Sequence, residues 1–228
     1  VHMPCRNMTK KDAEFVLTQF QNAGIESILA LRGDGKEGVE PCTDFEHASD
    51  LIKFIKKFDS KRTDGKKFKI LGACYPETHP QSKDILSDIQ GLKAKVDAGA
   101  EHLLSQLFFD NERFYRFLER TQIAGINVPI EAGIMPATNK KSIERMVSMT
   151  NAQLPKKFIK MMERYQDSPE AIRDAGIAYA VDQIVDLVTN GVHGIHLYTM
   201  NNSYVAKKIN DSVRSLFAEP PIEFTIKP

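Results

Sequence analysis

The chain has 228 residues, of which 42% are hydrophobic, and this is enough for one large domain with a substantial core. Its 31 lysine and arginine residues nearly balance 30 aspartate and glutamate residues, so no net field attracts a nucleic acid or an anionic membrane. Because no apolar run approaches the roughly 20 residues that cross a bilayer, we expect neither a nucleic-acid partner nor a membrane association.

Helical and strand patterns alternate from the amino terminus. A short strand over residues 1–5 precedes a helix that Thr9 caps and Gly24 ends, with one apolar face. A buried apolar strand follows over residues 27–31. A second helix, with Thr43 and Glu46 as a possible capping box, then leads to a strand over residues 68–75.

The same alternation continues to the carboxyl terminus. The pattern predicts strands over residues 102–108, 128–132 and 194–198, separated by helices. Helices are predicted at 85–96, 111–121, 141–149, 156–164, 169–190 and 203–216. Repeated βα units of this kind form a parallel sheet.

The predicted fold is therefore α/β, a (β/α)8 TIM barrel that is incomplete here. Six strands are visible, whereas a closed barrel of this type needs eight. We expect residues 1–218 to form a partial barrel domain of about six βα units. The proline-rich residues 219–228 are expected to form a surface tail.

The three cysteines are Cys5, Cys42 and Cys74, and they form no Cys-x-x-Cys pair. An odd number without that spacing argues against a disulfide framework and a structural zinc site. We expect a cytoplasmic location and no bound metal. Cys5 and Cys74 are interpreted as small buried side chains near strand ends, with a reactive thiol as the alternative.

Polar residues follow or interrupt four of the apolar strands, and barrel enzymes keep their chemistry at the carboxyl ends of such strands. These segments are Arg32-Gly33-Asp34, the stiff loop from Tyr75 to His79, Gln106 inside an apolar strand, and Tyr198. A buried amide such as that of Gln106 needs a hydrogen-bond partner. The residues alone leave a purely structural interpretation open for each segment. Arg32-Gly33-Asp34 could be a solvated turn and the loop from Tyr75 to His79 a capping loop. Gln106 could be a hydrogen-bonded core glutamine and Tyr198 a core tyrosine.

Taken together, the four segments resemble the methylenetetrahydrofolate reductases, a family of flavin-dependent barrel enzymes. The resemblance runs in the family's order from Val1 to about Leu216. It implies reduction of 5,10-methylenetetrahydrofolate to 5-methyltetrahydrofolate, with FAD as cofactor and NADH or NADPH as donor. It also implies a homo-oligomer and a role in methionine biosynthesis.

The resemblance assigns residues to this chemistry. Asp34 and Gln106 are implied to be catalytic and to bind the substrate, with Gln106 meeting both folate and nicotinamide. The implied FAD contacts are His2, Arg32, Gly33, Asp34, Ala48, Tyr75, His79, Asp88, Lys95 and Tyr198. Read without the resemblance, Asp88 and Lys95 would be a solvated helix face.

Some positions depart from the family's pattern. Lys140 stands where well-known members carry an aromatic residue that packs on the bound substrate, and Ala94, Gly91 and His47 also replace common family residues. The family's general acid is a glutamate on the first barrel strand, and neither Glu77 nor Glu131 matches its position. We therefore expect the first two βα units to be missing and the isolated chain to be inactive.

Two other functions stay open. One is another flavin-dependent barrel oxidoreductase, similar to proline dehydrogenase, which would not need the Arg-Gly-Asp strand end. The other is a non-catalytic barrel subunit, and related proteins of some anaerobes work with an electron-donating partner subunit.

Overall fold

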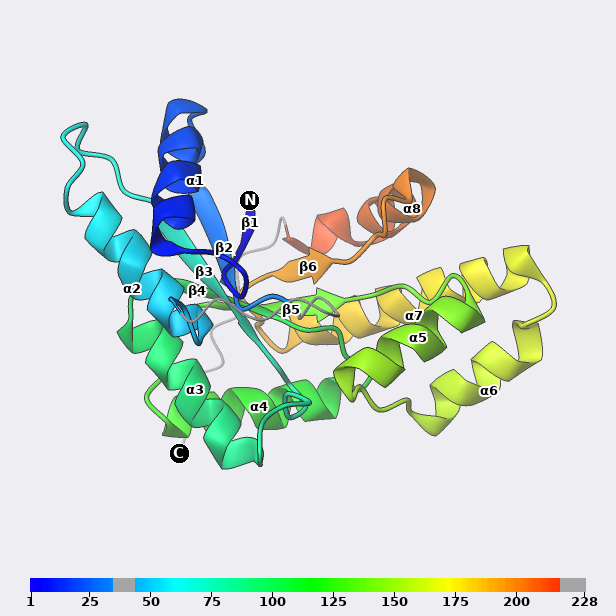
Figure 1. Cartoon of the computed structure of the whole chain (residues 1–228). Coiled ribbons are helices and arrows are strands. Elements are labelled where there is room, and N and C mark those ends of the chain that lie inside the picture. The colour runs from blue at the N-terminus through cyan, green and yellow to red at the C-terminus, as the bar shows by residue number, and fades with distance from the viewer. Residues whose placement is uncertain (35–43, 218–228) are drawn as a thin grey trace. The chain divides into compact units, whose positions relative to one another are not determined.

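The computed structural model describes residues 1–34 and 44–217, and these form two compact units. The first unit comprises Val1–Cys74, Leu86–Leu104 and Arg120–Pro129, and the second comprises Tyr75–Ile85, Ser105–Glu119 and the residues from Ile130 onward. Figure 1 labels the elements. In chain order they are β1 (His2–Pro4), α1 (Lys10–Asn22), β2 (Ser27–Leu31), α2 (Ala48–Asp59), β3 (Lys69–Cys74), α3 (Ile85–Asp97), β4 (His102–Ser105), α4 (Asn111–Ile123), β5 (Ile130–Ile134), α5 (Lys140–Thr150), α6 (Lys156–Tyr165), α7 (Pro169–Thr189), β6 (Ile195–Leu197), α8 (Ser203–Val213) and the 3₁₀ turn η1 (Arg214–Phe217).

In the first unit the strands lie in chain order and pair in parallel. Pro4 of β1 is level with Leu31 of β2, and Ala30 of β2 is level with Gly72 of β3. Parallel neighbours need a crossover between them, and α1 and α2 provide it. A continuous core of apolar side chains joins these strands to the two helices: Met3, Cys5, Ala13, Leu17, Ile28, Ala30, Phe45, Leu51, Ile52, Ile55, Phe68, Ile70 and Ala100.

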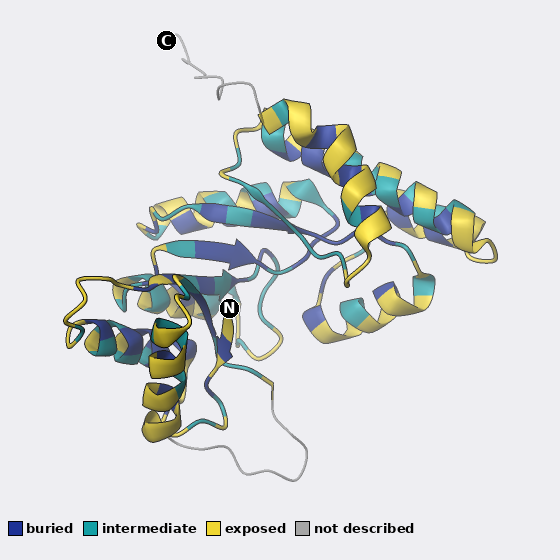
Figure 2. Ribbon diagram, turned by 90° about the horizontal axis from the view of Figure 1, so that it is seen from above, coloured by how far each residue is buried: buried dark blue, intermediate teal, exposed yellow. Residues whose placement is uncertain are grey.

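In the second unit β5 pairs in parallel with β6, with Gly133 level with His196. Its core gathers side chains from the segments after β4 and β5 and from α5, α6 and α7: Leu107, Phe109, Met135, Ala137, Ile143, Ala152, Phe158, Met162 and Ile172. Figure 2 shows buried and exposed bands alternating along the helices, as the apolar periodicity predicts.

The helix caps show where the local sequence sets the boundaries. Thr9 caps α1 as predicted: its hydroxyl accepts from the Asp12 N–H at 3.1 Å, and Asp12 accepts from the Thr9 N–H at 3.0 Å. The predicted cap of α2 is wrong, since α2 begins later, at Ala48, with His47 as its N-cap and Asp50 accepting from the His47 N–H. Thr43 itself lies outside the described residues.

All six predicted strands are present, and parallel strands alternate with helices, so the α/β prediction is confirmed. Two strands have other bounds than predicted: β5 is shifted to Ile130–Ile134, and β4 stops at Ser105, before Gln106, and not at residue 108. The cause is local, because the Gln106 side-chain oxygen accepts the Leu107 N–H at 2.9 Å, a group that a continuing strand would need for its ladder. The single-domain extent to residue 218 and the surface tail at 219–228 stay predictions, and the tail lies outside the described residues.

Among the described helices, none combines the length and the apolar character that a membrane span requires.

Candidate active site

In the first unit, Arg32, Gly33 and Asp34 come directly after β2. The backbone there is fixed by β1, because the Arg32 carbonyl accepts from the Arg6 N–H at 2.8 Å and the Cys5 N–H at 3.2 Å. The Asp34 side chain is exposed. A strand end held by backbone hydrogen bonds therefore carries an exposed carboxylate.

Gly33 shows why only glycine suits this turn. Its φ is +83°, in the left-handed region, and a Cβ at this position would lie 2.8 Å from the Cβ of Pro4. The turn therefore depends on the missing side chain both for its conformation and for its close approach to β1.

Lys95 of α3 reaches back to the carboxyl end of β3. Its Nζ donates to the Ala73 carbonyl at 2.8 Å, and the register that pairs Ala30 with Gly72 puts Ala73 level with Leu31. Burial lowers the pKa of Lys95, while Cys74 and Asp88 act in the opposite direction. Lys95 makes no ion pair within the described residues, so an anionic ligand would be a favourable partner for its ammonium group.

Both described cysteines are buried. Burial raises the pKa of Cys74 to about 12 and that of Cys5 to about 11. A thiolate is the reactive form, and these shifts suppress it. The geometry therefore favours small buried side chains over reactive thiols.

His2 and Ala48 occupy less conspicuous places in the first unit. His2 is exposed and level with Leu29, so it stands in β1 before the end of the strand. Ala48 is the buried first residue of α2. Their implied contact with FAD stays a prediction.

In the second unit, Tyr75 and His79 contact each other across the loop after β3. Their rings meet edge to face with centroids 4.4 Å apart. The His79 Nδ1 accepts from the Gln81 N–H at 3.0 Å, so in the neutral ring Nε2 carries the proton. The pair gives this loop an aromatic surface with a defined donor.

Ser105 organises the neighbourhood of Gln106 and Tyr198, and sequence reasoning missed it. The Ser105 side chain is fully buried; its Oγ donates to the Gln106 carbonyl at 3.0 Å and accepts from the Gly133 N–H at 2.8 Å. The Tyr198 hydroxyl donates to the Ser105 carbonyl at 2.9 Å. A Cβ on Gly133 would lie 2.3 Å from that same carbonyl, so glycine is required there.

Gln106 is not inside a strand as predicted. It follows β4, is half-buried, and uses its side-chain oxygen for the Leu107 N–H. Its amide nitrogen makes no hydrogen bond within the part of the chain that the structure describes. Two N–H donors are thus available to a ligand, which fits a binding role better than a satisfied core glutamine.

The predicted residues thus form two local groups. The first unit holds His2, Arg32, Gly33, Asp34, Ala48, Asp88 and Lys95. The second unit holds Tyr75, His79, Gln106 and Tyr198. The meeting of both groups on one ligand stays a prediction.

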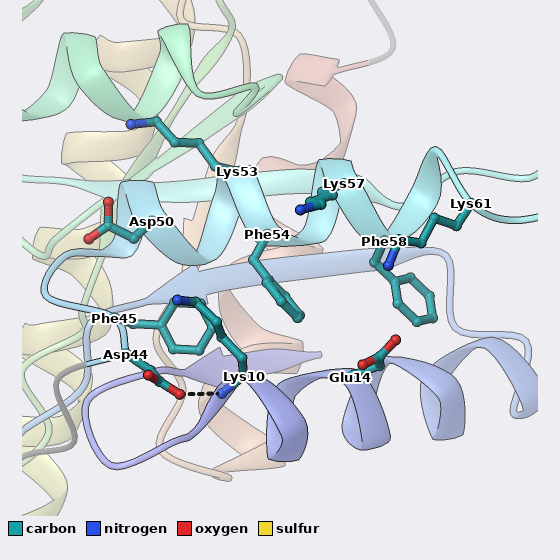
Figure 3. Close-up of a pocket in the computed structure, with 10 residues that line it drawn as sticks. All are labelled: Lys10, Glu14, Asp44, Phe45, Asp50, Lys53, Phe54, Lys57, Phe58 and Lys61. Carbon is teal, nitrogen blue, oxygen red and sulfur yellow. Dashed lines mark hydrogen bonds between the residues drawn. The ribbon is translucent and has the colours of Figure 1, made fainter.

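A separate groove of about 500 Å³ lies in the first unit between α1 and α2 (Figure 3). It contains none of the predicted site residues. Lysines and phenylalanines dominate its lining, and two of its carboxylates are used locally: Asp44 accepts from the Lys10 N–H and Asp50 caps α2. Within residues 1–34 and 44–217, no cluster of histidine, cysteine and carboxylate side chains is suited to a metal ion.

Parallel strands followed by helices, with polar side chains directly after β2, β3, β4 and β6, define a protein of the β/α-barrel class. A sequence profile of the family described as methylenetetrahydrofolate reductase matches residues 1–214. The chain belongs to the methylenetetrahydrofolate reductase family, which decides against the proline dehydrogenase alternative.

Individual relatives agree with this assignment. The chain is 36% identical over 211 residues to the 5,10-methylenetetrahydrofolate reductase of Buchnera aphidicola, covering 91% of this chain and 68% of that protein. It is 35% identical over 208 residues to the enzyme of that name in Escherichia coli, covering 91% and 67%. Methylenetetrahydrofolate reductase 2 of Saccharomyces cerevisiae is 36% identical over 208 residues, but only 34% of its length is covered.

Among solved structures, the fold is similar to that of an uncharacterized protein from Clostridium thermocellum described as binding two copies of 5-methyl-5,6,7,8-tetrahydrofolic acid. The TM-score is 0.63 at 14% identity, covering 96% of this chain and 73% of that one. This similarity supports the fold.

Proposed function

We propose that the protein containing this chain reduces 5,10-methylenetetrahydrofolate to 5-methyltetrahydrofolate, with FAD as cofactor and NADH or NADPH as donor. The observation that carries the proposal is the family match over residues 1–214, together with bacterial relatives of that name at about 35% identity. FAD, when bound, supplies a carrier for hydride between the nicotinamide and the folate.

The residues of the chain suit a flavin dinucleotide. The Lys95 ammonium group, held by a carbonyl and without an ion pair among the described residues, is suited to the diphosphate. Gly33 is proposed to contact the flavin through its backbone, since its side-chain position faces Pro4, and Tyr75, His79 and Tyr198 supply aromatic surface. His2, Arg32, Ala48 and Asp88 are the further contacts that we propose.

Asp34 and Gln106 are proposed to handle the substrates. Asp34 offers a carboxylate that accepts hydrogen bonds from the N–H edge of a pterin. Gln106 donates from its amide nitrogen, because its oxygen is engaged with Leu107. One pocket that takes the two substrates in turn would allow this amide to meet both of them.

The general acid is proposed to lie outside this chain. Glu77 is held by other groups in the second unit, both of its oxygens lying within 3.1 Å of the Gln153 N–H. The chain spans 68% and 67% of the two bacterial relatives. We therefore propose that a glutamate outside the residues of this chain has this role, as the family resemblance implies. A cytoplasmic homo-oligomer is proposed as well.

The experiment uses the full-length protein under anaerobic conditions. We expect a yellow protein whose flavin absorbance is bleached by NADH or NADPH and restored by 5,10-methylenetetrahydrofolate. A colourless protein that binds no added FAD would overturn the proposal. A flavin that is bleached but never restored by the folate would point to a different oxidoreductase, and a flavin that neither nicotinamide reduces would favour an electron-donating partner subunit.

A further inference from the structure

The loop that carries Tyr75 and His79 is anchored by a carboxylate that the proposed function does not use. Glu77 lies between the two rings in sequence, and its side chain is 10% exposed. Its two carboxylate oxygens lie 3.1 and 2.9 Å from the Gln153 N–H, which donates to them. The loop is thereby tied to the segment between α5 and α6.

Arg113 of α4 closes the arrangement. Its Nε lies 3.2 Å from a Glu77 oxygen, and its Nη2 donates to the Gln153 side-chain oxygen. Asp110, at 3.6 Å from the Arg113 Nε, is a weaker second partner. Each of Glu77, Arg113 and Gln153 therefore contacts the other two, and three separate segments of the second unit meet in this triad.

The burial of Glu77 distinguishes this triad from a surface ion pair. Burial raises the pKa of Glu77, whereas the Gln153 N–H and Arg113 lower it. By contrast, the Lys157–Asp182 pair in the same unit has side chains that are 77% and 71% exposed, and such pairs contribute little. Removing the cationic partner of a buried carboxylate leaves the negative charge uncompensated, which lowers the stability of the folded protein.

The triad acts on the site through a short and stiff piece of chain. Tyr75 and His79 are each two residues from Glu77, so the chain that joins either of them to Glu77 spans at most about 7 Å. Pro76 and Pro80 restrict the backbone on both sides of Glu77. A shift of Glu77 would therefore move both rings.

We propose that Glu77, Arg113 and Gln153 form a positioning latch that holds Tyr75 and His79 in the orientation that binds the cofactor. Glu77 and Arg113 are positioning residues, since they act through the loop. The consequence for the flavin rests on the proposed function, whereas the anchoring of the loop does not.

The anchoring is tested by hydrogen exchange and limited trypsin digestion of full-length protein without added flavin. Glu77→Gln keeps the size of the side chain and removes its charge. Glu119→Gln on exposed α4 surface is the matched control. We expect the Gln153 amide to exchange about tenfold faster in Glu77→Gln, because a neutral acceptor replaces a charged one. We also expect cleavage after exposed Lys83 to accelerate. Unchanged rates would overturn the latch.

The flavin consequence is tested by FAD titration and by the spectrum of the bound flavin. Glu77→Gln and Arg113→Gln should each weaken FAD binding about tenfold and shift the spectrum, with partial recovery in Arg113→Lys and none of these changes in Glu119→Gln. Affinity and spectrum equal to those of the unmodified protein would refute the positioning role. If the unmodified protein binds no FAD, the proposed function fails, while the exchange experiment still decides the latch.

Discussion

The turn after β2 can be tested by adding a single methyl group. In Gly33→Ala, the new Cβ would lie 2.8 Å from the Cβ of Pro4 while φ stays at +83°. The turn cannot move away cheaply, since the Arg32 carbonyl accepts from both the Cys5 and Arg6 N–H groups. Gly24→Ala is a matched control, because Gly24 has φ +70° and nothing within 4 Å of its added Cβ.

The two variants separate the free-energy cost of the left-handed conformation from the cost of overpacking. A left-handed conformation costs an L-residue about 1–2 kcal/mol, and both variants incur it. Overpacking adds about 1–3 kcal/mol, and only Gly33→Ala incurs it. We therefore expect Gly24→Ala to lose about 1–2 kcal/mol of unfolding free energy and Gly33→Ala to lose about 2–5 kcal/mol.

The measurement is urea unfolding of the full-length protein and the two variants after removal of the flavin. The unfolding free energies are compared with the same dependence on urea concentration for all three proteins. FAD affinity gives a second readout: we expect it to fall in Gly33→Ala, where Arg32 and Asp34 are displaced, and to hold in Gly24→Ala. Losses of unfolding free energy equal to within about 0.5 kcal/mol would refute the argument that the contact with Pro4 constrains this turn.

Three further predictions concern single side chains. Asp34→Asn should slow the reoxidation of reduced flavin by folate about tenfold or more, as loss of a hydrogen bond to a charged group implies. Flavin reduction by the nicotinamide should change little. Stopped-flow absorbance measures both steps, and equal slowing of the two would contradict a role of Asp34 in the folate step alone. Lys95→Met should weaken FAD binding about tenfold. It should not destabilise the flavin-free protein, because it removes a half-buried cation. Lys93→Met on the same helix is the control, and an unchanged affinity in fluorescence titration would argue against a diphosphate at Lys95. Cys74 should resist iodoacetamide at pH 8 until the protein unfolds, since burial raises the pKa of the folded thiol to about 12. The unfolded thiol ionises near pH ~8.5. The contribution of Cys74 to stability is therefore present below that pH and is lost as the pH rises toward 12. Peptide mapping that finds Cys74 alkylated in the native protein would contradict the burial argument.

The helices and most strands could be predicted because their signals are local. The apolar spacing of Ala13 and Leu17 and the Thr9–Asp12 capping box depend only on residues within one or two turns. Boundaries failed where a side chain competes with the backbone. Gln106 takes the Leu107 N–H and ends β4 early, and His47 with Asp50 sets the start of α2.

The site was predictable in part. Residue types after the strands and the family resemblance predict roles for Asp34, Tyr75 and Gln106, because such residues carry chemistry through their own functional groups. Ser105 and the Glu77 latch gave no such signal, since their importance comes from contacts between segments distant in the chain, such as Glu77 with Gln153. A buried hydroxyl or a shielded carboxylate is recognised only once its partners are known.

Lys140 shows how a departure from the family's pattern can be reinterpreted from its contacts. Its Nζ donates to the Gln166 side-chain oxygen at 2.6 Å, so the first residue of α5 is joined to the residue that caps the carboxyl end of α6. A phenylalanine could not make this bond. The lysine therefore has a structural partner of its own in this chain, and its presence is no argument against substrate binding.

The position of Gln106 has a direct chemical consequence. With one acceptor position of its oxygen occupied by the Leu107 N–H, the side chain offers a ligand two N–H donors and a single remaining acceptor position. A glutamine within a strand, as first expected, would have left both ends of the amide to be satisfied and either end to face a ligand. The early end of β4 thus favours donation by this amide, and the proposed pterin and nicotinamide carboxamide both carry carbonyl groups that would accept from it.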